Sequence, residues 1–165
     1  MTSISLDNKL LDATNWRILQ ILQENARISF AELAKLVNLT APAVAERVRK
    51  METAGIITGY QARVNLPALG YGIIVLIQLA VPCEREKRLI EFLQGRAEVL
   101  ECYNITGKDS FVVKVAVPSV ARLEQVLEAI SKFGQPTTHI VLSHTIPPRG
   151  VGPNLECNHE QNSLD

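Results

Sequence analysis

The sequence has 165 residues with 17 Lys and Arg against 17 Asp and Glu, so its formal net charge is zero. Its hydrophobic fraction of 47% is that of a globular protein and well above the range of disordered chains. The length suffices for one ordinary domain or two small ones. The charge balance excludes a basic surface over the whole chain, which is the usual electrostatic footprint of nucleic-acid binding.

The cysteines and the apolar runs indicate the compartment. Cys83, Cys102 and Cys157 are odd in number and form no C-x-x-C pair, which favours reduced thiols over a disulfide or a zinc site. The longest apolar run, residues 73–79, is too short to cross a bilayer. No charged segment followed by an apolar segment opens the chain. We expect a soluble cytoplasmic protein with no membrane segment, metal ion or cofactor.

A first helix follows ten polar residues that we expect to be frayed. Leu11, Ile18, Leu19 and Leu22 fall at helical spacing, with Asp12 near the N-terminus, where the helix dipole favours an acid. The pattern predicts a helix that ends near residue 25.

A second helix is indicated by Ser29 and Glu32, which have the spacing of a capping box. Leu33, Leu36 and Val37 then supply its buried face. These positions predict a short helix that packs by one side.

A tight turn and a third helix come next. Asn38 tolerates the left-handed conformation that often ends a helix, Thr40 can cap the next helix, and Pro42 fits its first turn. The third helix runs from about residue 41 to 54, and Gly55 stops it. Its core residues recur at helical spacing and are Val44, Val48 and Met51.

The outer side of the third helix begins with small residues and ends with basic ones. Small residues let a backbone approach base edges, and long basic residues reach phosphates, so this side is a candidate surface for double-stranded DNA. The alternative is an ordinary solvated face, because residues 1–60 contain seven Lys and Arg against six Asp and Glu. The candidate DNA-binding residues are Arg27, Ser29, Thr40, Ala41, Ala43, Glu46, Arg47, Arg49 and Lys50.

Two of these candidates have structural alternatives of their own. Arg47 can pair with Glu46 or Glu52 instead of a phosphate. Arg27 can touch the DNA backbone or remain a solvent-exposed residue at a helix end.

A wing and a connector complete the first half. Residues 56–57, a turn at 58–59 and residues 60–64 are expected to form a short hairpin, which makes residues 1–64 a winged helix-turn-helix domain. Pro67, Gly70 and Gly72 mark residues 65–72 as a connector.

The second half has a βαββαβ order, which is the ferredoxin-like pattern. We expect strands over 73–81, 98–106, 111–117 and 139–146, a helix over 85–93, and a second helix capped by Ser119. Residues 73–147 form this domain, and residues 148–165 are a polar tail that we expect to be mobile. The whole chain is thus predicted to be an α+β protein.

The turn between the middle strands, residues 107–110, has two interpretations. It can line a pocket for a small effector, or it can be a tight β-turn that needs Gly107 for a positive φ. Enzyme motifs such as a P-loop, G-x-S-x-G or H-E-x-x-H do not occur. His139 and His144, five apart on one expected strand, would face opposite sides, and Cys157 with His159 in the tail is only weak support for a metal site.

The two halves together resemble the Lrp/AsnC family of leucine-responsive and feast/famine regulators over about residues 11–146. Each matching motif is weak alone, but their combined spacing is specific. The motifs are Leu11-Asp12 with Ile18-Leu19, Arg27-Ile28-Ser29, Glu32-Leu33-Ala34, Arg47-Val48 followed by Gly55-Ile56-Ile57, and Gly59-Tyr60.

The resemblance implies a sequence-specific transcription regulator of bacteria or archaea and not an enzyme. It implies dimers that pair through their C-terminal sheets, assembly up to octamers, and an amino acid or other small effector bound between dimers. The effector residues it suggests are Tyr103, Asn104, Thr106, Gly107, Lys108, Asp109 and Ser110.

Three positions depart from the family pattern. Asn15 stands where the family often has an acid, and Asn38 stands where it often has Gly. Ser110 stands where the family has an Asp that helps to hold the effector's amino group, with Asp109 one place earlier. Since a shift of one residue along a strand reverses the side-chain direction, either the ligand differs or there is none.

Two other classes of function compete with the regulator. Siroheme decarboxylases resemble the same family but act on a tetrapyrrole, and such an enzyme here would have only Tyr71, Tyr103, His139 and His144 as candidate ligand-holding groups. A protein that coats DNA with little sequence preference is the third possibility.

Overall fold

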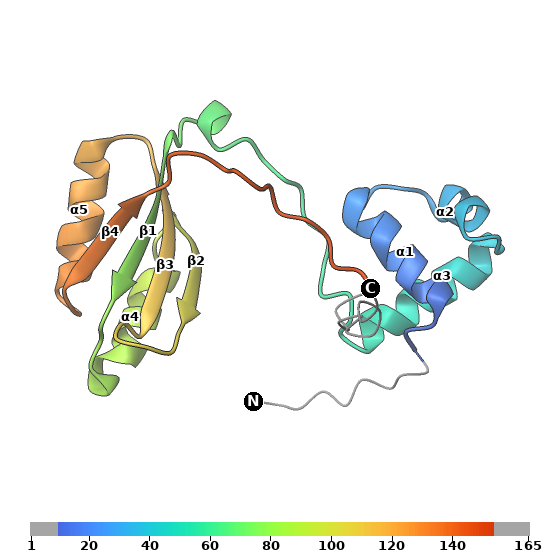
Figure 1. Ribbon diagram of the computed structural model, residues 1–165, viewed down its shortest axis with the longest axis horizontal. Helices are drawn as coiled ribbons and strands as arrows, with labels where there is room; N and C mark the ends of the chain where they lie inside the picture. Colours follow the sequence, from blue (N-terminus) through green and yellow to red (C-terminus); the bar gives the residue numbers. More distant parts are fainter. Residues whose placement is uncertain (1–9, 154–165) are drawn as a thin grey trace, which may run out of the picture. The chain divides into compact units, whose positions relative to one another are not determined.

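The computed structural model describes residues 10–153, which form two compact units (Figure 1). Of the described residues, 10–62 together with 147–153 belong to the first unit, and residues 63–146 form the second. The segment after residue 146, expected as a separate tail, is therefore grouped with the N-terminal unit.

Three helices make the N-terminal unit: α1 (Ala13–Glu24), α2 (Phe30–Leu36) and α3 (Ala41–Thr53). Their apolar stripes meet in one core, in which Ile18, Leu33, Val44 and Met51 are fully buried. The three-helix arrangement is the predicted helix-turn-helix.

Each of these helices begins at a side-chain cap. Asp12 accepts a hydrogen bond from the backbone N–H of Asn15 at 2.7 Å, and Ser29 forms the complete predicted capping box with Glu32. Thr40 accepts from the N–H of Ala43 at 3.4 Å. The caps satisfy helix N–H groups that otherwise have no partner, so the sequence positions α2 and α3 locally.

The turn between α2 and α3 confirms the expected role of Asn38, whose φ of 54° is left-handed. The predicted burial of Leu36 is wrong, because its side chain is 55% exposed while Ala34 is buried. Side chains two residues apart on a helix point about 200° away from each other around its axis, so Leu36 points outward when Ala34 is buried.

The predicted hairpin of the wing is also wrong, because residues 56–64 contain no β-strand. The N–H groups of Ile56 and Ile57 both donate to the carbonyl of Met51, at 2.9 and 3.2 Å, and so close the end of α3 instead of pairing across a hairpin. The Tyr60 hydroxyl then donates to Glu52 at 2.9 Å. Burial, followed by this hydrogen bond, raises the pKa of Tyr60 to about 12.

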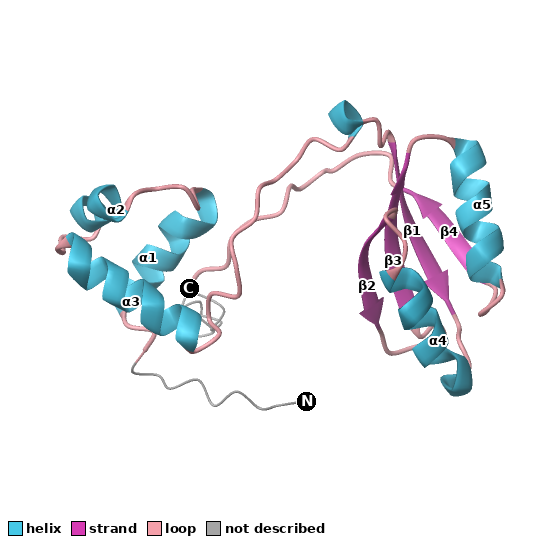
Figure 2. Cartoon of the chain, turned by 180° about the vertical axis from the view of Figure 1, so that it is seen from behind, coloured by secondary structure: helices cyan, strands magenta, loops and turns pink. Residues whose placement is uncertain are grey.

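The second unit is a four-stranded antiparallel sheet with two helices. Figure 2 shows its strands and helices from behind. The sheet order is β2-β3-β1-β4, as the βαββαβ pattern requires. The elements are the 3-10 turn η1 (Pro67–Leu69), β1 (Ile73–Leu79), α4 (Cys83–Gln94), β2 (Val99–Asn104), β3 (Phe111–Val117), α5 (Val120–Ser131) and β4 (Pro136–Ile140).

The two faces of this sheet differ. Val75, Ile77 and Leu79 of β1 are fully buried in a core that includes Leu89 of α4 and Ile130 of α5. The alternate residues point to the other face, because successive side chains of a strand alternate.

No helix of the second unit covers that other face. Leu76 at its centre is 36% exposed and Tyr103 is 53% exposed. We refer to the face that carries Leu76, Tyr103, Val112 and His139 as the open face.

The last strand lies earlier than the predicted residues 139–146. It pairs with β1, from Pro136 opposite Leu79 to Ile140 opposite Val75. Because β1 begins at Ile73, residues after about 141 have no β1 residue opposite them. Pro136 is tolerated because it starts an edge strand. His144 is thus outside β4. The expectation that His139 and His144 face opposite sides of one strand therefore no longer applies.

The structure adds little to the other expectations on metals and membranes. Among residues 10–153, no three His, Cys, Asp or Glu side chains lie together as a metal site, and no helix is long and apolar enough to cross a bilayer. Cys83 and Cys102 are free. Cys157, His159 and the ends of the chain (1–9 and 154–165) lie outside the described residues.

The segment after residue 146 contacts α1. The Gln23 side chain accepts a hydrogen bond from the N–H of Val151 at 2.8 Å and donates to the Val151 carbonyl at 3.0 Å. A Cβ on Gly150 would lie 3.0 Å from three atoms of Gln23, so a residue without a side chain permits this approach. We call residues 150–152 the C-terminal strap.

Candidate nucleic-acid interface and ligand pocket

The outer side of α3 presents the predicted order of small and then basic residues. Thr40 is exposed at the N-terminus of the helix, and Ala41 and Ala43 are partly exposed in its first turn. About two turns later, the side chains of Arg49 and Lys50 are 66% and 57% exposed. The capped end of α3 can therefore approach bases closely while the later turns reach phosphates.

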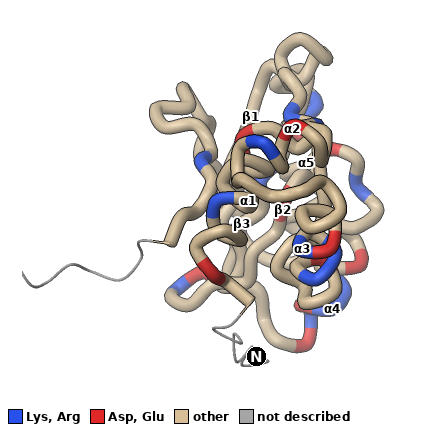
Figure 3. Tube along the Cα trace, turned by 90° about the vertical axis from the view of Figure 1, so that its right-hand side faces the viewer, with Lys and Arg blue, Asp and Glu red and all other residues tan. Residues whose placement is uncertain are grey.

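Glu46 lies between these regions and binds both exposed cations. Its carboxylate accepts from Arg49 Nε at 3.0 Å and from Arg49 Nη2 at 2.8 Å, and Lys50 Nζ is 3.7 Å from Oε1. The hydrogen bonds from Arg49 are the main reason why the pKa of Glu46 is lowered. Figure 3 shows acidic and basic segments next to each other along α3.

Arg47 has a structural partner that sequence reasoning missed. Its guanidinium donates to Asp12 at 2.7 Å and to Asn15 at 3.0 Å, which joins α3 to the start of α1. Neither Glu46 nor Glu52 is its partner, contrary to the alternative considered from the sequence. Asn15 is 3% exposed and also donates from Nδ2 to the Leu10 carbonyl at 2.6 Å. Both polar groups of its side-chain amide therefore have hydrogen-bond partners, at a position where the family often has an acid.

The two candidate DNA-binding residues before α2, Ser29 and Arg27, also differ in whether their side chains bond within the chain. Ser29 is exposed, but its hydroxyl donates to Glu32 Oε2 at 2.7 Å within the capping box. Arg27 is exposed at the end of the loop, and its backbone N–H donates to the Asn25 side chain. Arg27 is therefore free to extend toward a DNA backbone, whereas Ser29 primarily organises α2.

The turn at residues 107–110 is held to β1 by Ser110. The Ser110 hydroxyl accepts from the N–H of Val81 at 2.9 Å, and the Ser110 N–H donates to the Leu79 carbonyl at 2.8 Å. Gly107 has a φ of 125°, a backbone conformation that favours glycine. A tight turn accounts for both residues without a ligand.

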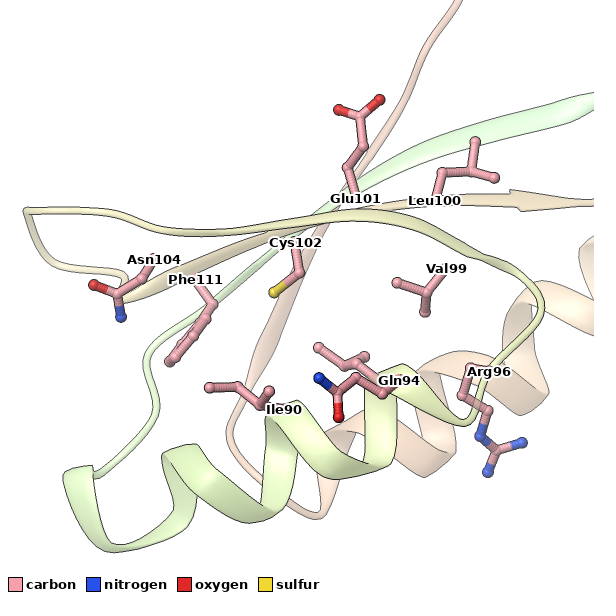
Figure 4. Close-up of a pocket in the computed structure, with 10 residues that line it drawn as sticks. Ile90, Gln94, Arg96, Val99, Leu100, Glu101, Cys102, Asn104 and Phe111 are labelled. Carbon is pink, nitrogen blue, oxygen red and sulfur yellow. The ribbon is translucent and has the colours of Figure 1, made fainter. Parts of the chain in front are cut away.

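A hollow of about 420 Å³ lies next to this turn, between β2 and the C-terminal half of α4 (Figure 4). Ile90, Val99, Cys102 and Phe111 point into it, whereas Glu101 points to the other side of the strand (Figure 4). Burial raises the pKa of the Cys102 thiol. The hollow is mostly apolar, and the polar residues of its lining are Gln94, Arg96, Glu101 and Asn104, a composition typical of small-molecule sites.

The seven candidate effector residues do not form one pocket in a single chain. Asn104 lines the hollow, but its neighbour Tyr103 is on the open face, where its hydroxyl donates to Glu101 at 2.6 Å. Residues 106–108 are exposed in the turn. The alternation along β2 could have indicated this split, but no signal in the sequence pointed to Ile90 and Gln94, because their place depends on how α4 packs.

These two units define a class of protein: the chain belongs to the Lrp/AsnC family of helix-turn-helix transcriptional regulators. The AsnC-type helix-turn-helix domain matches residues 11–52, and the Lrp/AsnC ligand binding domain matches residues 73–151. Both matches confirm the predicted family, the helix-turn-helix unit and the αβ unit.

Particular relatives place the chain within the family. The uncharacterised HTH-type transcriptional regulator YezC of Bacillus subtilis is 41% identical over 81% of this chain and 94% of its own length. The structure of Escherichia coli AsnC has a TM-score of 0.76 at 33% identity and covers 84% of this chain and 96% of AsnC. The regulator NMB0573 of Neisseria meningitidis, solved as a complex with L-Met, has a TM-score of 0.82 at 23% identity. The match covers 87% of this chain and 97% of NMB0573. The curated relatives are named as regulators, which confirms the prediction of a regulator and not an enzyme.

Proposed function

We propose that this protein binds near-palindromic duplex DNA as a symmetric oligomer in the cytoplasm and that a small ligand of its αβ unit adjusts this binding. The observation that carries the proposal is the outer side of α3, with its Thr40 cap, small first turn and exposed Arg49 and Lys50. Two such helices related by a twofold axis fit successive major grooves about 34–36 Å apart.

A selection from a random duplex library tests the DNA part. We expect enriched sites with two related half-sites one helical turn apart, and binding to them that is tighter than to random duplex by about 10³-fold or more. Equal affinity for both duplexes would instead support a DNA-coating protein.

Two substitutions on α3 separate phosphate contacts from base contacts. Lys50→Ala should weaken binding to selected and random duplexes by a similar factor, because phosphate contacts carry no sequence information. Ala43→Phe should weaken binding to the selected site more than binding to random duplex, because it blocks the close approach of the first turn. If neither substitution changes a gel shift, α3 is not the recognition helix.

The hollow beside β2 is the site that we propose for the ligand. Its apolar lining from α4, β2 and Phe111 of β3 suits an apolar side chain, and the amides of Gln94 and Asn104 can hydrogen-bond a polar head group. The lining favours a small amphipathic molecule, and apolar amino acids such as L-Met, the ligand of the neisserial regulator, are the first probes.

Thermal shift with a panel of amino acids tests this site, because a ligand that binds only the folded state raises Tm. Ile90, which is 43% exposed, permits a matched pair of variants. Ile90→Lys should abolish the ligand-induced rise, and Glu91→Lys, on the same helix but outside the hollow, should preserve it. A rise that survives Ile90→Lys would place the ligand elsewhere.

A further inference from the structure

Every cation of α3 is held by an acid of its own unit. Arg47 is bound to Asp12, while Arg49 and Lys50 share Glu46. The exposed helix that should attract phosphate thus has its positive charge compensated before DNA arrives.

The geometry of the Glu46 cluster makes this compensation specific. Both oxygens of Glu46 accept from Arg49, at 3.0 and 2.8 Å, in the fork arrangement that Arg also uses for phosphate. The same donors cannot bind a phosphate oxygen and Glu46 at once. The carboxylate, 47% exposed, also repels an approaching phosphate.

The cluster can nevertheless open. Exposed ion pairs contribute only about 0–1 kcal/mol because water and salt screen them. A matched DNA site that gains base contacts from the first turn of α3 can offset the cost of releasing Arg49 and Lys50. Random DNA offers the same phosphates and meets the same opening cost, so the restraint lowers the affinity for both kinds of duplex.

We propose that Glu46 is an affinity-limiting residue that restrains Arg49 and Lys50, so that the protein binds both random and matched duplexes more weakly than the two cations would otherwise allow. The proposal rests on the DNA-binding function proposed above. It assigns Glu46 no contact with DNA, although the residue was a candidate DNA-binding residue from the sequence. A direct role, in which the carboxylate accepts from the amino group of a cytosine, is the competing possibility.

Glu46→Gln and Glu52→Gln form a matched pair for the test. Both substitutions remove one negative charge from α3 and keep the side-chain shape. Glu52 bonds the Tyr60 hydroxyl and no cation among the interactions of the described residues, so only Glu46→Gln releases Arg49 and Lys50. Full-length protein and both variants are titrated with random and selected duplexes over a range of KCl, after their helical content has been compared.

We expect Glu46→Gln to bind random duplex about tenfold more tightly at 0.1 M KCl. The plot of the logarithm of the binding constant against the logarithm of the KCl concentration should be steeper by about 0.9 for each further phosphate that the released cations neutralise. Its affinity for the selected site should rise by a similar factor, because the cost of releasing Arg49 and Lys50 is the same on both duplexes. Glu52→Gln should change neither affinity by more than about twofold.

Three other outcomes overturn the inference, and they can be told apart. Equal effects of both substitutions would show that only net charge matters. A loss restricted to the selected site, relieved by a change at one base pair, would show that Glu46 reads a base. Failure of the unmodified protein to bind any duplex would remove the proposed function and the inference with it.

Discussion

At the scale of single residues, Asp12 combines two functions that the sequence shows only in part. It caps α1 through the N–H of Asn15, and it pairs with Arg47 of α3. The cap could be predicted from an acid before an apolar helix. The ion pair could not, because it joins residues 35 positions apart whose distance only the packing of α1 on α3 decides.

Substitutions at Asp12 separate the cap from the ion pair. Asp12→Asn keeps an effective cap but removes the charge, so at pH 7 it should cost less than about 1 kcal/mol of unfolding free energy, given that both partners are partly exposed. Asp12→Ala also removes the cap and should cost about 1 kcal/mol more. Urea unfolding followed by circular dichroism measures both values. Equal costs for the two variants would mean that the cap contributes nothing.

The same pair predicts a pH dependence. The hydrogen bond from Arg47, followed by that from the Asn15 N–H, lowers the pKa of Asp12 in the folded state. A lowered folded pKa means that the stabilisation is fully present above the unfolded value of about 4 and is lost as the pH falls through the folded pKa. The stability difference between the unmodified protein and Asp12→Asn should therefore shrink from pH 7 toward pH 2. A difference that is constant over this range would exclude the carboxylate as its source.

At the scale of elements, the β2–β3 hairpin shows how a departure from the family pattern is absorbed. Ser110 offers a hydroxyl that accepts from the N–H of Val81 and lies 3.4 Å from the carbonyls of Leu79 and Val81. It thereby fastens the hairpin to the end of β1. Sequence reasoning treated this position as a question of ligand binding, whereas the structure gives it a structural partner within the chain.

Ser110→Ala tests the fastening. It leaves the N–H of the buried Val81 without its partner, which should cost about 1–3 kcal/mol. Ser131→Ala is the control, because its hydroxyl bonds a backbone carbonyl on an exposed stretch of α5 and should change stability by no more than about 0.5 kcal/mol. Thermal unfolding of both variants gives the comparison, and similar values would mean that Ser110 is not a structural residue.

At the scale of the whole molecule, the open face of the sheet is the surface that we propose for pairing with a second copy. Leu76 at its centre is exposed, although it belongs to the central strand β1. An apolar residue at the centre of a sheet face is normally covered, because one face of an antiparallel sheet packs and the other is polar when solvated. The pairing of two chains would also double the weak DNA contacts of one α3.

Leu76→Glu should therefore give a monomer at concentrations where the unmodified protein is a dimer or larger, since two buried carboxylates would face each other. Val120→Glu is the control: Val120 is also an exposed apolar residue, 58% accessible, but it starts α5 away from the open face. Light scattering measures both masses. An unchanged mass for Leu76→Glu would exclude the open face as the interface.

The C-terminal strap belongs to this scale as well, because it returns a late segment of the chain to α1. Gln23→Ala removes both hydrogen bonds to Val151 and should release the strap, so that trypsin cleaves after Arg149 faster. Gly150→Ala should have a similar effect by displacing Gln23. Glu24→Ala, the next residue of α1, is the control. Cleavage at the same rate in all four proteins would show that the strap is not held by Gln23.

The sequence by itself determined the local features of this protein: the caps at Ser29 and Thr40, the left-handed Asn38, the βαββαβ order and the family. These depend on residues close together in the chain, where propensity and hydrogen bonding act directly. The tertiary structure alone decided the partner of Arg47, the early end of β4 and the place of Ile90 in the hollow. Each depends on groups brought together by packing, and the spacing of residues along the chain carries no direct signal for such distances.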